Sequence, residues 1–144
     1  MSIWFAPPST EPFNARAPGS AVAHLGIEFT DMGEDHLSAR MPVDERTRQP
    51  MGLLHGGSSV LLAETLASSA CFATLDPSQQ FCVGQEINAN HLRSVREGWV
   101  TGVARPIHRG ASSQVWEVRI SDEQGRLVCI SRVTMAVLKH RRPG

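Results

Sequence analysis

The sequence predicts a single α+β domain in which an antiparallel sheet of about six strands wraps around one long central helix. Two patterns predict this fold. Residues 57–74 are small or apolar and rich in helix formers, and the segments around them have the composition and alternation of strands. The predicted helix is apolar on nearly every side, which is typical of a helix enclosed by other structure. Because every downstream segment has strand character, the enclosing structure is expected to be a sheet.

Composition narrows the class of protein. The chain has 144 residues with 41% hydrophobic and 19% charged side chains, which suits one soluble domain with a buried core. The formal net charge is zero, so no overall positive field favours nucleic acid. There is no visible signal peptide and no apolar stretch long enough to cross a bilayer, so we expect no membrane association and a cytoplasmic protein. Cys71, Cys82 and Cys129 are widely spaced in apolar contexts and are expected to be buried thiols, with no metal site.

Three regions are expected along the chain. Residues 1–20 form a proline-rich N-terminal arm, residues 21–139 form the domain, and residues 140–144 form a basic tail. The arm has no pattern of its own, so we expect it to order only by lying on the domain or on a partner subunit. Trp4 and Phe5 are the candidate docking residues.

The strands follow from alternation and from turn residues. A hairpin is expected before the helix, with its turn at residues 33–35. Four further strands, connected as a meander, are expected at residues 81–95, 100–108, 112–121 and 127–138. The third of these alternates most clearly, with Trp116, Val118 and Ile120 on one face. Residues 122–125 have the chemistry of a short hairpin turn.

Glu64 is the only ionisable carboxyl between Val60 and Leu75 in the predicted helix. An unpaired carboxylate in apolar surroundings costs free energy, so a structural partner or a chemical role should account for it. The structural alternative is an ion pair with Arg93 or another base, or a place in a subunit interface. The chemical alternative is favoured by Ser68, which lies one turn further on the same face and whose hydroxyl can orient a water beside the carboxylate.

Gly56 and Gly57 open the helix, where backbone N–H groups have no intrahelical partner and the helix dipole is positive. Without a Cβ, either glycine lets a substrate carbonyl approach its peptide N–H closely. A backbone donor, a carboxyl about two turns inside and a hydroxyl one turn further on are the parts of acyl-transfer chemistry. The alternative is a plain glycine turn, with His55 as a cap or a packing residue.

A family resemblance rests on the segment QPMGLLHGG at residues 49–57, followed by AETLAS at residues 63–68. These segments resemble the hotdog-fold acyl-CoA thioesterases, in the branch of 1,4-dihydroxy-2-naphthoyl-CoA thioesterase, the proofreading thioesterase of enterobactin synthesis and one type of 4-hydroxybenzoyl-CoA thioesterase. The resemblance runs from about His24 to Leu138. Its other motifs are AHLGI at 23–27, MPVD at 41–44, NANH at 88–91 and DEQGR at 122–126. It implies a sheet wrapped around one long helix, dimers that join sheets edge to edge, and tetramers made of two dimers.

The resemblance also implies catalytic roles. Glu64 would be the nucleophile or general base, and Gly56 the backbone donor to the thioester oxygen. Gln49 and His55 would help to hold the thioester, and Ser68 would position the hydrolytic water. Active sites of this family lie between two subunits, so Gln49 and His55 would come from one chain and Glu64 from the other. A monomer should then be inactive.

Further residues are implied for the coenzyme A part of a substrate. The backbone around Val83 and Gly84 would line the pantetheine channel, and His91 and Arg93 would lie near the acyl or phosphate ends. The residues implied near the nucleotide phosphates are Arg109, Ser112 and Ser113. Arginine and hydroxyl groups form good hydrogen bonds with phosphate oxygens. The alternative for each of these residues is a solvent-exposed place on a strand with no ligand. Leu92 stands where relatives carry a second histidine, which changes the polarity expected at the acyl end.

The expected reaction is hydrolysis of an acyl-CoA thioester with an aromatic acyl group. CoA is part of the substrate, and no metal or redox cofactor is implied. Two routes stay open: attack by Glu64 to give a mixed anhydride, or attack by water with Glu64 as base. An acyl carrier protein could also present the substrate, because its phosphopantetheine has the same arm as CoA. The sequence leaves open a non-catalytic acyl-CoA-binding module and an enoyl-thioester hydratase, although no acid and histidine pair for the hydratase is found near Glu64.

Overall fold

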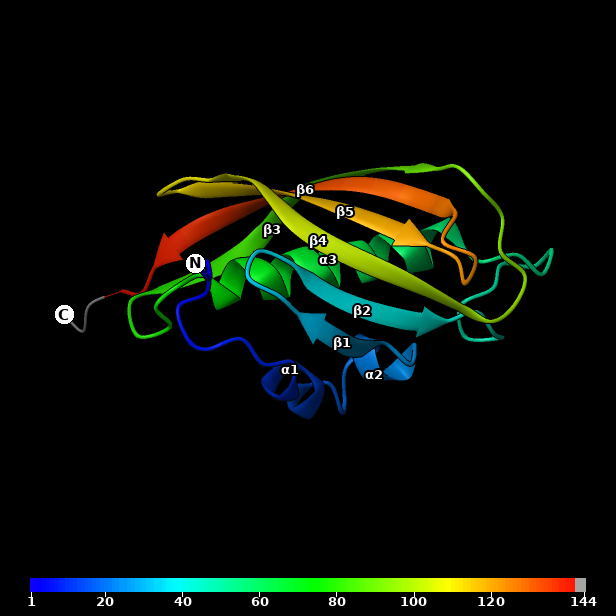
Figure 1. Cartoon of the computed structure of the whole chain (residues 1–144), viewed down its shortest axis with the longest axis horizontal. Helices are drawn as coiled ribbons and strands as arrows, with labels where there is room; N and C mark the ends of the chain where they lie inside the picture. The colour runs from blue at the N-terminus through cyan, green and yellow to red at the C-terminus, as the bar shows by residue number, and fades with distance from the viewer. Residues whose placement is uncertain (142–144) are drawn as a thin grey trace.

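The structure is a computed structural model that describes residues 1–141, and it has the α+β architecture that the sequence predicts. Six antiparallel strands form one sheet that curves around a single long helix (Figure 1). In chain order the elements are α1 (Glu11–Arg16), α2 (Ala21–His24), β1 (Glu28–Met32), β2 (Leu37–Pro42), α3 (Gly56–Ala73), β3 (Gln80–His91), β4 (Trp99–Arg109), β5 (Ser113–Ser121) and β6 (Leu127–Lys139).

The order of the strands in the sheet is β1-β2-β4-β5-β6-β3. The prediction of a four-stranded meander is therefore wrong: β4, β5 and β6 form one, but β3 pairs with β6 at the far edge and β2 pairs with β4. Strand β3 also ends at His91 rather than at Val95, because the chain leaves the sheet there and Val95 accepts a backbone hydrogen bond from Leu54. Periodicity identifies strands, whereas the choice of neighbour depends on how the chain crosses the helix.

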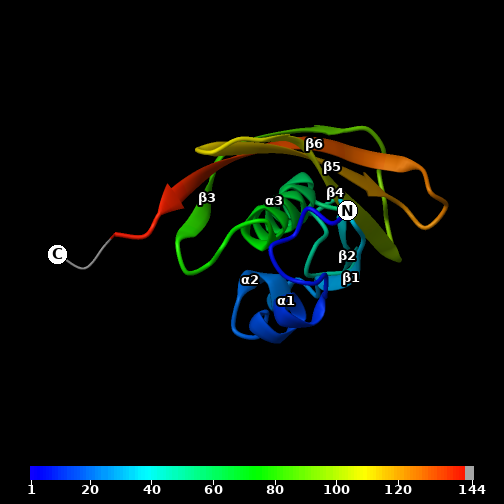
Figure 2. The ribbon, with the colours of Figure 1, turned by 60° about the vertical axis from the view of Figure 1, so that its left-hand side comes forward.

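Helix α3 lies on the concave face of the sheet, with the α1 and α2 segment along its other side (Figure 2). Its sheet-facing side is fully buried, including Leu62, Leu66 and Ala70. Gly102 of β4 permits this close packing, since a Cβ at that position would lie 2.7 Å from Leu66 Cδ1. The expected enclosure is incomplete, because the opposite side of α3 is partly exposed in the single chain. Among the described residues, no helix has both the length and the apolar character that a membrane crossing requires.

The sheet side of the core confirms the predicted alternation of β5. Trp116, Val118 and Ile120 are fully buried, while Arg119 on the other face is exposed. Register places Trp116 opposite Val133 of β6, so the largest fully buried side chain lies on a strand flanked by β4 and β6 inside the sheet. Burial of such side chains is the main favourable contribution to folding.

The N-terminal arm is more ordered than its composition predicts. It contains α1, and α2 follows directly after it; neither helix has a predictive pattern in the sequence. Trp4 is buried, stacks on Trp116 with ring centroids 6.2 Å apart, and donates its indole N–H to the Gly33 carbonyl at 2.6 Å. Its predicted docking role is therefore confirmed, on its own chain. The Phe5 side chain is 58% exposed, and Phe5 docks only through its backbone N–H, which donates to the Ala73 carbonyl at 2.9 Å. Within the basic tail only His140 and Arg141 are described; the rest lies outside the described residues.

The three cysteines are free thiols. Cys71 and Cys129 are buried, as predicted, but Cys82 on β3 is only half-buried. The Cys71 and Cys82 side chains are neighbours: a hydrogen bond to Cys82, together with burial, raises the pKa of the Cys71 thiol. Burial alone raises the pKa of Cys129. Raised pKa values keep both buried thiols protonated and unreactive.

Asp122 organises the turn between β5 and β6. Its carboxylate accepts hydrogen bonds from the backbone N–H groups of Gln124 and Arg126, at 3.0 and 2.9 Å, and from the Arg126 guanidinium at 2.8 Å. Burial raises the pKa of this carboxyl, but the hydrogen bonds and the charge of Arg126 outweigh burial and hold the pKa below its ordinary value of 3.8. A lowered pKa in the folded state means that ionised Asp122 stabilises the fold above that ordinary value.

The stabilisation by Asp122 should disappear in acid. We expect Asp122→Asn to unfold at a lower urea concentration than the parent at pH 7, because the variant lacks the charge that these donors bind. The difference should shrink as the pH falls below 3.8, where the parent carboxyl becomes protonated in the unfolded and then in the folded state. Urea titrations at pH 7, 5 and 3 measure it. If the parent and Asp122→Asn differed equally in their urea midpoints at all three pH values, the charge of Asp122 would make no contribution to stability.

Candidate active site

The loop before α3 is held in place by backbone hydrogen bonds. Gly52, at a φ of +84°, donates to the Gln49 carbonyl at 2.9 Å, and Gln49 donates to the Leu53 carbonyl at 2.8 Å. A φ in this left-handed region favours glycine, so the Pro50 and Gly52 pair explains the tight turn. The His55 N–H then donates to the Thr47 carbonyl at 2.8 Å, which fixes where α3 begins.

His55 caps α3 with its side chain. Its Nδ1 accepts a hydrogen bond from the Gly57 N–H at 2.8 Å, so the capping alternative for this residue is observed. The cap uses the Gly57 N–H, and the Gly56 N–H is left without a partner within the part of the chain that the structure describes. Of the two glycines that open the helix, Gly56 is therefore the one available to bind a substrate oxygen.

A cavity of about 350 Å³ lies at this end of α3, and it brings together four of the predicted site residues. They are Gln49, Gly56, His91 and Arg93. The His91 ring lies against Gly56, where a Cβ would come 2.8 Å from His91 Nε2, so the helix start needs a glycine. Gln49 Oε1 accepts a hydrogen bond from the Met51 N–H, which leaves the Gln49 amide nitrogen as the donor for a ligand. Ser59, which the sequence motifs did not indicate, also lines this cavity.

Glu64 occupies a different place from the one predicted. The expectation of a carboxylate buried in apolar surroundings is wrong for the single chain, in which Glu64 is exposed. Its carboxylate lies over Gly84 of β3, where any Cβ would collide with Glu64 Oε1. Among residues 1–141 it forms no ion pair, so the predicted alternative of a bond to Arg93 is not observed.

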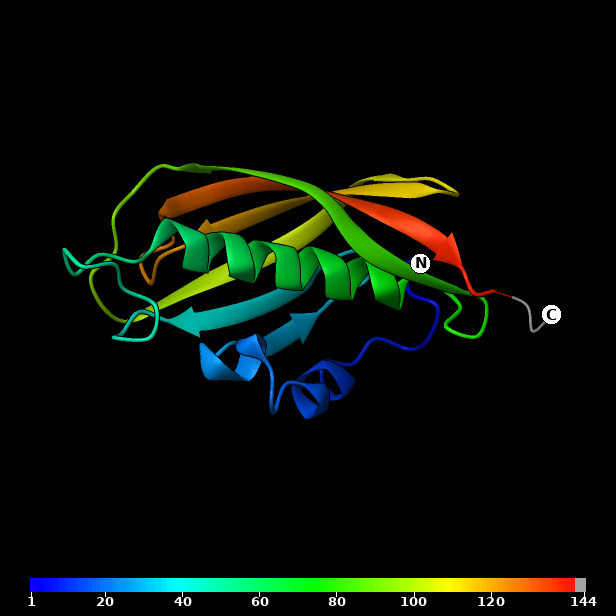
Figure 3. The same cartoon turned by 180° about the vertical axis from the view of Figure 1, so that it is seen from behind.

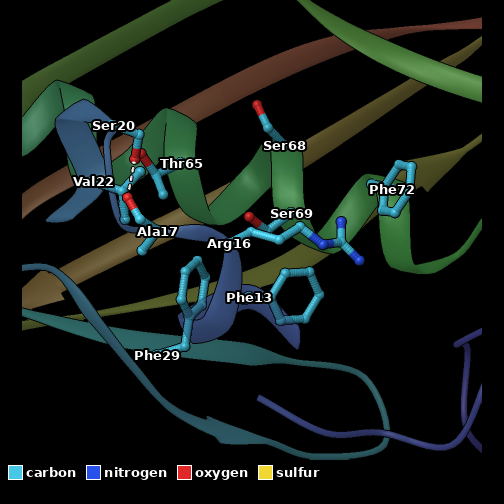
Figure 4. A pocket seen from close by; sticks show the side chains of 10 residues that line it. All are labelled: Phe13, Arg16, Ala17, Ser20, Val22, Phe29, Thr65, Ser68, Ser69 and Phe72. Atoms are coloured by element: carbon cyan, nitrogen blue, oxygen red, sulfur yellow. Dashed lines mark hydrogen bonds between the residues drawn. The ribbon is translucent and has the colours of Figure 1, made fainter. Parts of the chain in front are cut away.

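Ser68 lies one turn beyond Glu64 and lines a second cavity, of about 240 Å³, between α3 and the N-terminal arm (Figure 4). Its hydroxyl contacts Met135 Sδ at 3.7 Å, and Met135 is the register partner of Gly84. The arm contributes Phe13 and Arg16 to this cavity. Because the arm has no periodic pattern, the sequence holds no signal by which to find these two residues.

The predicted oxyanion donor, Gly56, and the predicted nucleophile or base, Glu64, are too far apart to act on the same thioester within one chain. Gly56 and Glu64 lie about 12 Å apart along the axis of α3, at about 1.5 Å per residue. Figure 3 shows the length of the helix from the side that the sheet does not cover. A thioester oxygen bound at the Gly56 N–H would therefore place its carbonyl carbon out of reach of Glu64 in the same chain.

The residues predicted to bind the CoA nucleotide lie at the other end of α3. Arg109, Ser112 and Ser113 belong to the hairpin between β4 and β5. This hairpin is near the end of α3, because Gln114 donates to the Thr74 hydroxyl at 2.9 Å and Thr74 caps the helix. Val83 and Gly84 are exposed on β3, midway between the two ends. The structure thus distributes the predicted site along the whole exposed side of α3.

Comparison with known proteins gives consistent matches. A sequence profile of the thioesterase superfamily matches residues 51–129. The 1,4-dihydroxy-2-naphthoyl-CoA hydrolase of Escherichia coli (strain K12) is 52% identical over 136 residues, which are 94% of this chain and 99% of that protein. Proofreading thioesterase EntH of Cronobacter turicensis is also 52% identical over 136 residues, 94% of this chain and 98% of that protein.

Solved structures agree with the sequence matches. A mutant of thioesterase PA1618 from Pseudomonas aeruginosa superimposes with a TM-score of 0.95 at 50% identity, over 96% of this chain and 100% of that chain. Thioesterase HI1161 from Haemophilus influenzae superimposes with a TM-score of 0.92 at 48% identity, over 95% of each chain. The sheet wrapped around α3 and these likenesses define a hotdog-fold thioester hydrolase, as the sequence motifs predict. The chain belongs to the thioesterase superfamily.

Proposed function

We propose that the protein hydrolyses acyl-CoA thioesters to the free acid and CoA, at a site that two copies of the chain complete. The observation that carries the proposal is a pair of groups on α3 that have no partner among residues 1–141, the Gly56 N–H and the Glu64 carboxylate, in a member of the thioesterase superfamily. One group can bind a thioester oxygen and the other can supply a nucleophile or a base. Their separation of about 12 Å along α3 means that each has to work with a group from a second copy.

The edge of the sheet supports such a pairing. β3 is a 12-residue strand that pairs with β6 on one side only, and its residues Val83 and Gly84 are exposed. A long open edge of this kind favours pairing with another strand. Antiparallel pairing of two β3 strands about a twofold axis would place two α3 helices side by side in opposite directions. The start of one helix would then lie beside the middle of the other, so Glu64 of one copy would face Gly56 and Gln49 of the second.

The same pairing accounts for the exposure of Glu64 and Gly84 in the single chain, since both would become interface residues. A dimer of this kind leaves the outer faces of the two sheets available for a second association. The family resemblance implies that two such dimers form a homotetramer, and this assembly stays a prediction.

In the proposed reaction, the thioester oxygen accepts a hydrogen bond from the Gly56 N–H, while the Gln49 amide and His55 hold the thioester. Glu64 of the second copy attacks the acyl carbon or removes a proton from the attacking water, and Ser68 positions that water. The C–S bond then breaks, and the CoA sulfur leaves as a thiolate that takes up a proton. If Glu64 is the nucleophile, water then hydrolyses the mixed anhydride, which releases the free acid and restores the carboxylate; if water attacks, the free acid forms directly. These steps use only side chains, backbone and water, so the proposal includes no metal or redox cofactor.

We propose an aromatic acyl group as the preferred substrate. The support is the similarity to a 1,4-dihydroxy-2-naphthoyl-CoA hydrolase, together with the cavity of about 350 Å³ that includes apolar Leu53, Leu54 and Val128 in its lining. The CoA arm would follow the β3 backbone at Val83 and Gly84. The nucleotide phosphates would meet Arg109, Ser112 and Ser113. His91 and Arg93, which line the cavity at the start of α3, would lie near the acyl or phosphate ends. A phosphopantetheine arm on an acyl carrier protein fits the same description.

The test is a substrate panel of benzoyl-CoA, hydroxybenzoyl-CoA and medium-chain acyl-CoAs, with release of free thiol as the readout. We expect turnover with all of them and the highest kcat/KM with the aromatic thioesters, because flat apolar groups suit the cavity walls. Binding of every acyl-CoA without release of thiol would instead indicate a non-catalytic binding module. Turnover of medium chains alone would contradict the aromatic preference.

A further inference from the structure

Ser59 is an anomaly in the core. Its exposure is 1%, and its Oγ is the one buried side-chain polar atom among the described residues that lacks a hydrogen-bond partner. Leaving a buried hydroxyl unpaired costs free energy, and such groups in folded proteins usually have a water, an ion or a ligand as partner. Ser59 therefore points to a ligand atom that the single chain does not supply.

The position of Ser59 shows where this ligand atom would lie. Ser59 is in the first turn of α3, three residues after Gly56, and both residues line the cavity of about 350 Å³. Residues three apart share one face of a helix, and each Cα–Cβ bond tilts toward the helix start. The Ser59 Cα–Cβ bond thus tilts toward the turn that holds the free Gly56 N–H.

The hydroxyl also keeps its proton available. A serine in a helix commonly donates to the carbonyl four residues earlier, which here is that of His55. That carbonyl instead accepts the backbone N–H groups of Ser58 and Ser59, at 3.0 and 3.2 Å, and the Ser59 hydroxyl makes no bond to it. Ser59 Oγ can therefore donate to an oxygen in the cavity without breaking an existing hydrogen bond.

We propose that Ser59 is a further catalytic residue, whose Oγ is the second donor of the oxyanion site beside the Gly56 N–H. This inference rests on the proposed thioester hydrolysis. When the nucleophile oxygen bonds to the acyl carbon, the C=O π electron pair moves onto the thioester oxygen, where the N–H and the O–H both bind the new negative charge. The pair returns to re-form C=O as the C–S bond breaks, and Ser59 keeps its proton throughout. Two donors aimed at the same oxygen stabilise the charged intermediate more than the uncharged substrate.

The first test is Ser59→Ala, with Ser58→Ala as the matched control. Ser58 is the neighbouring serine of the same turn but does not line this cavity. We expect Ser59→Ala to lower kcat on the best acyl-CoA by about 10- to 100-fold with KM changed by less than about threefold, and Ser58→Ala to leave both unchanged. The melting temperature of Ser59→Ala should equal or exceed that of the parent, because the unpaired hydroxyl is removed. Wild-type kcat in Ser59→Ala would overturn the proposal.

A second measurement separates an oxyanion donor from a packing residue and does not depend on turnover. The affinity of two unreactive CoA analogues is compared: a ketone, with a methylene between sulfur and the carbonyl, and a thioether of the same length without the carbonyl. Ser59→Ala should lower the affinity for the ketone by about two- to threefold, in line with the small change in KM, and leave the affinity for the thioether unchanged. Equal weakening of both analogues would overturn the oxyanion role.

Two further outcomes are also decisive. If Ser59→Ala does not fold, Ser59→Cys, with a weaker donor of similar shape, should show the same selective loss of ketone affinity, and its absence would refute the role. If the parent protein binds both analogues but hydrolyses no acyl-CoA, the proposed function fails, and the ketone comparison still decides whether Ser59 binds a carbonyl oxygen.

Discussion

Glu64→Gln should lower kcat for acyl-CoA hydrolysis by at least about a thousandfold, more than any other single substitution in this chain. The glutamine amide has nearly the same shape as the carboxylate, but it can neither attack a thioester carbon nor remove a proton from water. Because Glu64 is exposed and unpaired within the single chain, its replacement breaks no ion pair among the described residues. Steady-state thiol release measures the rate, and thermal unfolding measures the stability, which we expect to change little.

Glu97→Gln is the matched control for this substitution. Glu97 is an exposed carboxylate in the loop before β4, and it lines neither of the two cavities described above. The control should keep the parent kcat. Near-parent turnover in Glu64→Gln would exclude both routes proposed for the carboxylate, whereas a higher KM with unchanged kcat would make Glu64 a binding group.

Mixing two inactive variants should restore activity if the site lies between two copies. Glu64→Gln removes the carboxylate from one side of each site, and Gln49→Ala removes the amide donor from the other. A dimer with one chain of each kind would contain one site with both groups intact and one site with neither. Random exchange of equal amounts should therefore recover roughly a quarter of the parent activity, because half of the dimers are mixed and each has one intact site.

The measurement needs subunit exchange, by mild denaturation and joint refolding, with each variant refolded alone as the control. Thiol release above the sum of the two separate variants supports the shared site. Activity equal to that sum, in a sample shown by differential tagging to contain mixed dimers, would mean that Glu64 and Gln49 act within one chain. Such a result would contradict the proposed site between two copies.

The local elements of this fold are determined by short-range patterns. Apolar helix formers between Gly56 and Thr74 produce α3, and the alternation of Trp116, Val118 and Ile120 produces a strand with one buried face. The motif around Gly56 also indicates a free backbone donor, because any helix start leaves N–H groups unpaired. These features depend on residues within a few positions of each other, so the sequence alone predicts them.

The sequence holds a signal for Ser59 that the motifs around Gly56 and Glu64 do not include. Its spacing from Gly56 places both residues on one helix face, and this spacing could have identified Ser59 as a site candidate. Its unpaired state could not be predicted, because that depends on which carbonyls and side chains surround its Oγ in the folded chain. The arm residues Phe13 and Arg16 have no sequence pattern, since the places of their segment follow from contacts with distant Phe29: the Phe13 ring lies 5.1 Å from the Phe29 ring, and the Asn14 amide bonds to the Phe29 backbone N–H and carbonyl.

A long helix that carries a backbone donor and a carboxylate, with strands around it, follows from the amino-acid sequence without coordinates. Three features of the site emerge only in the folded chain: β3 lies at the sheet edge beside β6, Glu64 is exposed over Gly84, and His55 leaves the Gly56 N–H free. The difference lies in the range of the interactions. Helix and strand formation depends on neighbours along the chain, whereas strand order, burial and hydrogen-bond partners depend on segments that meet only when the whole core packs.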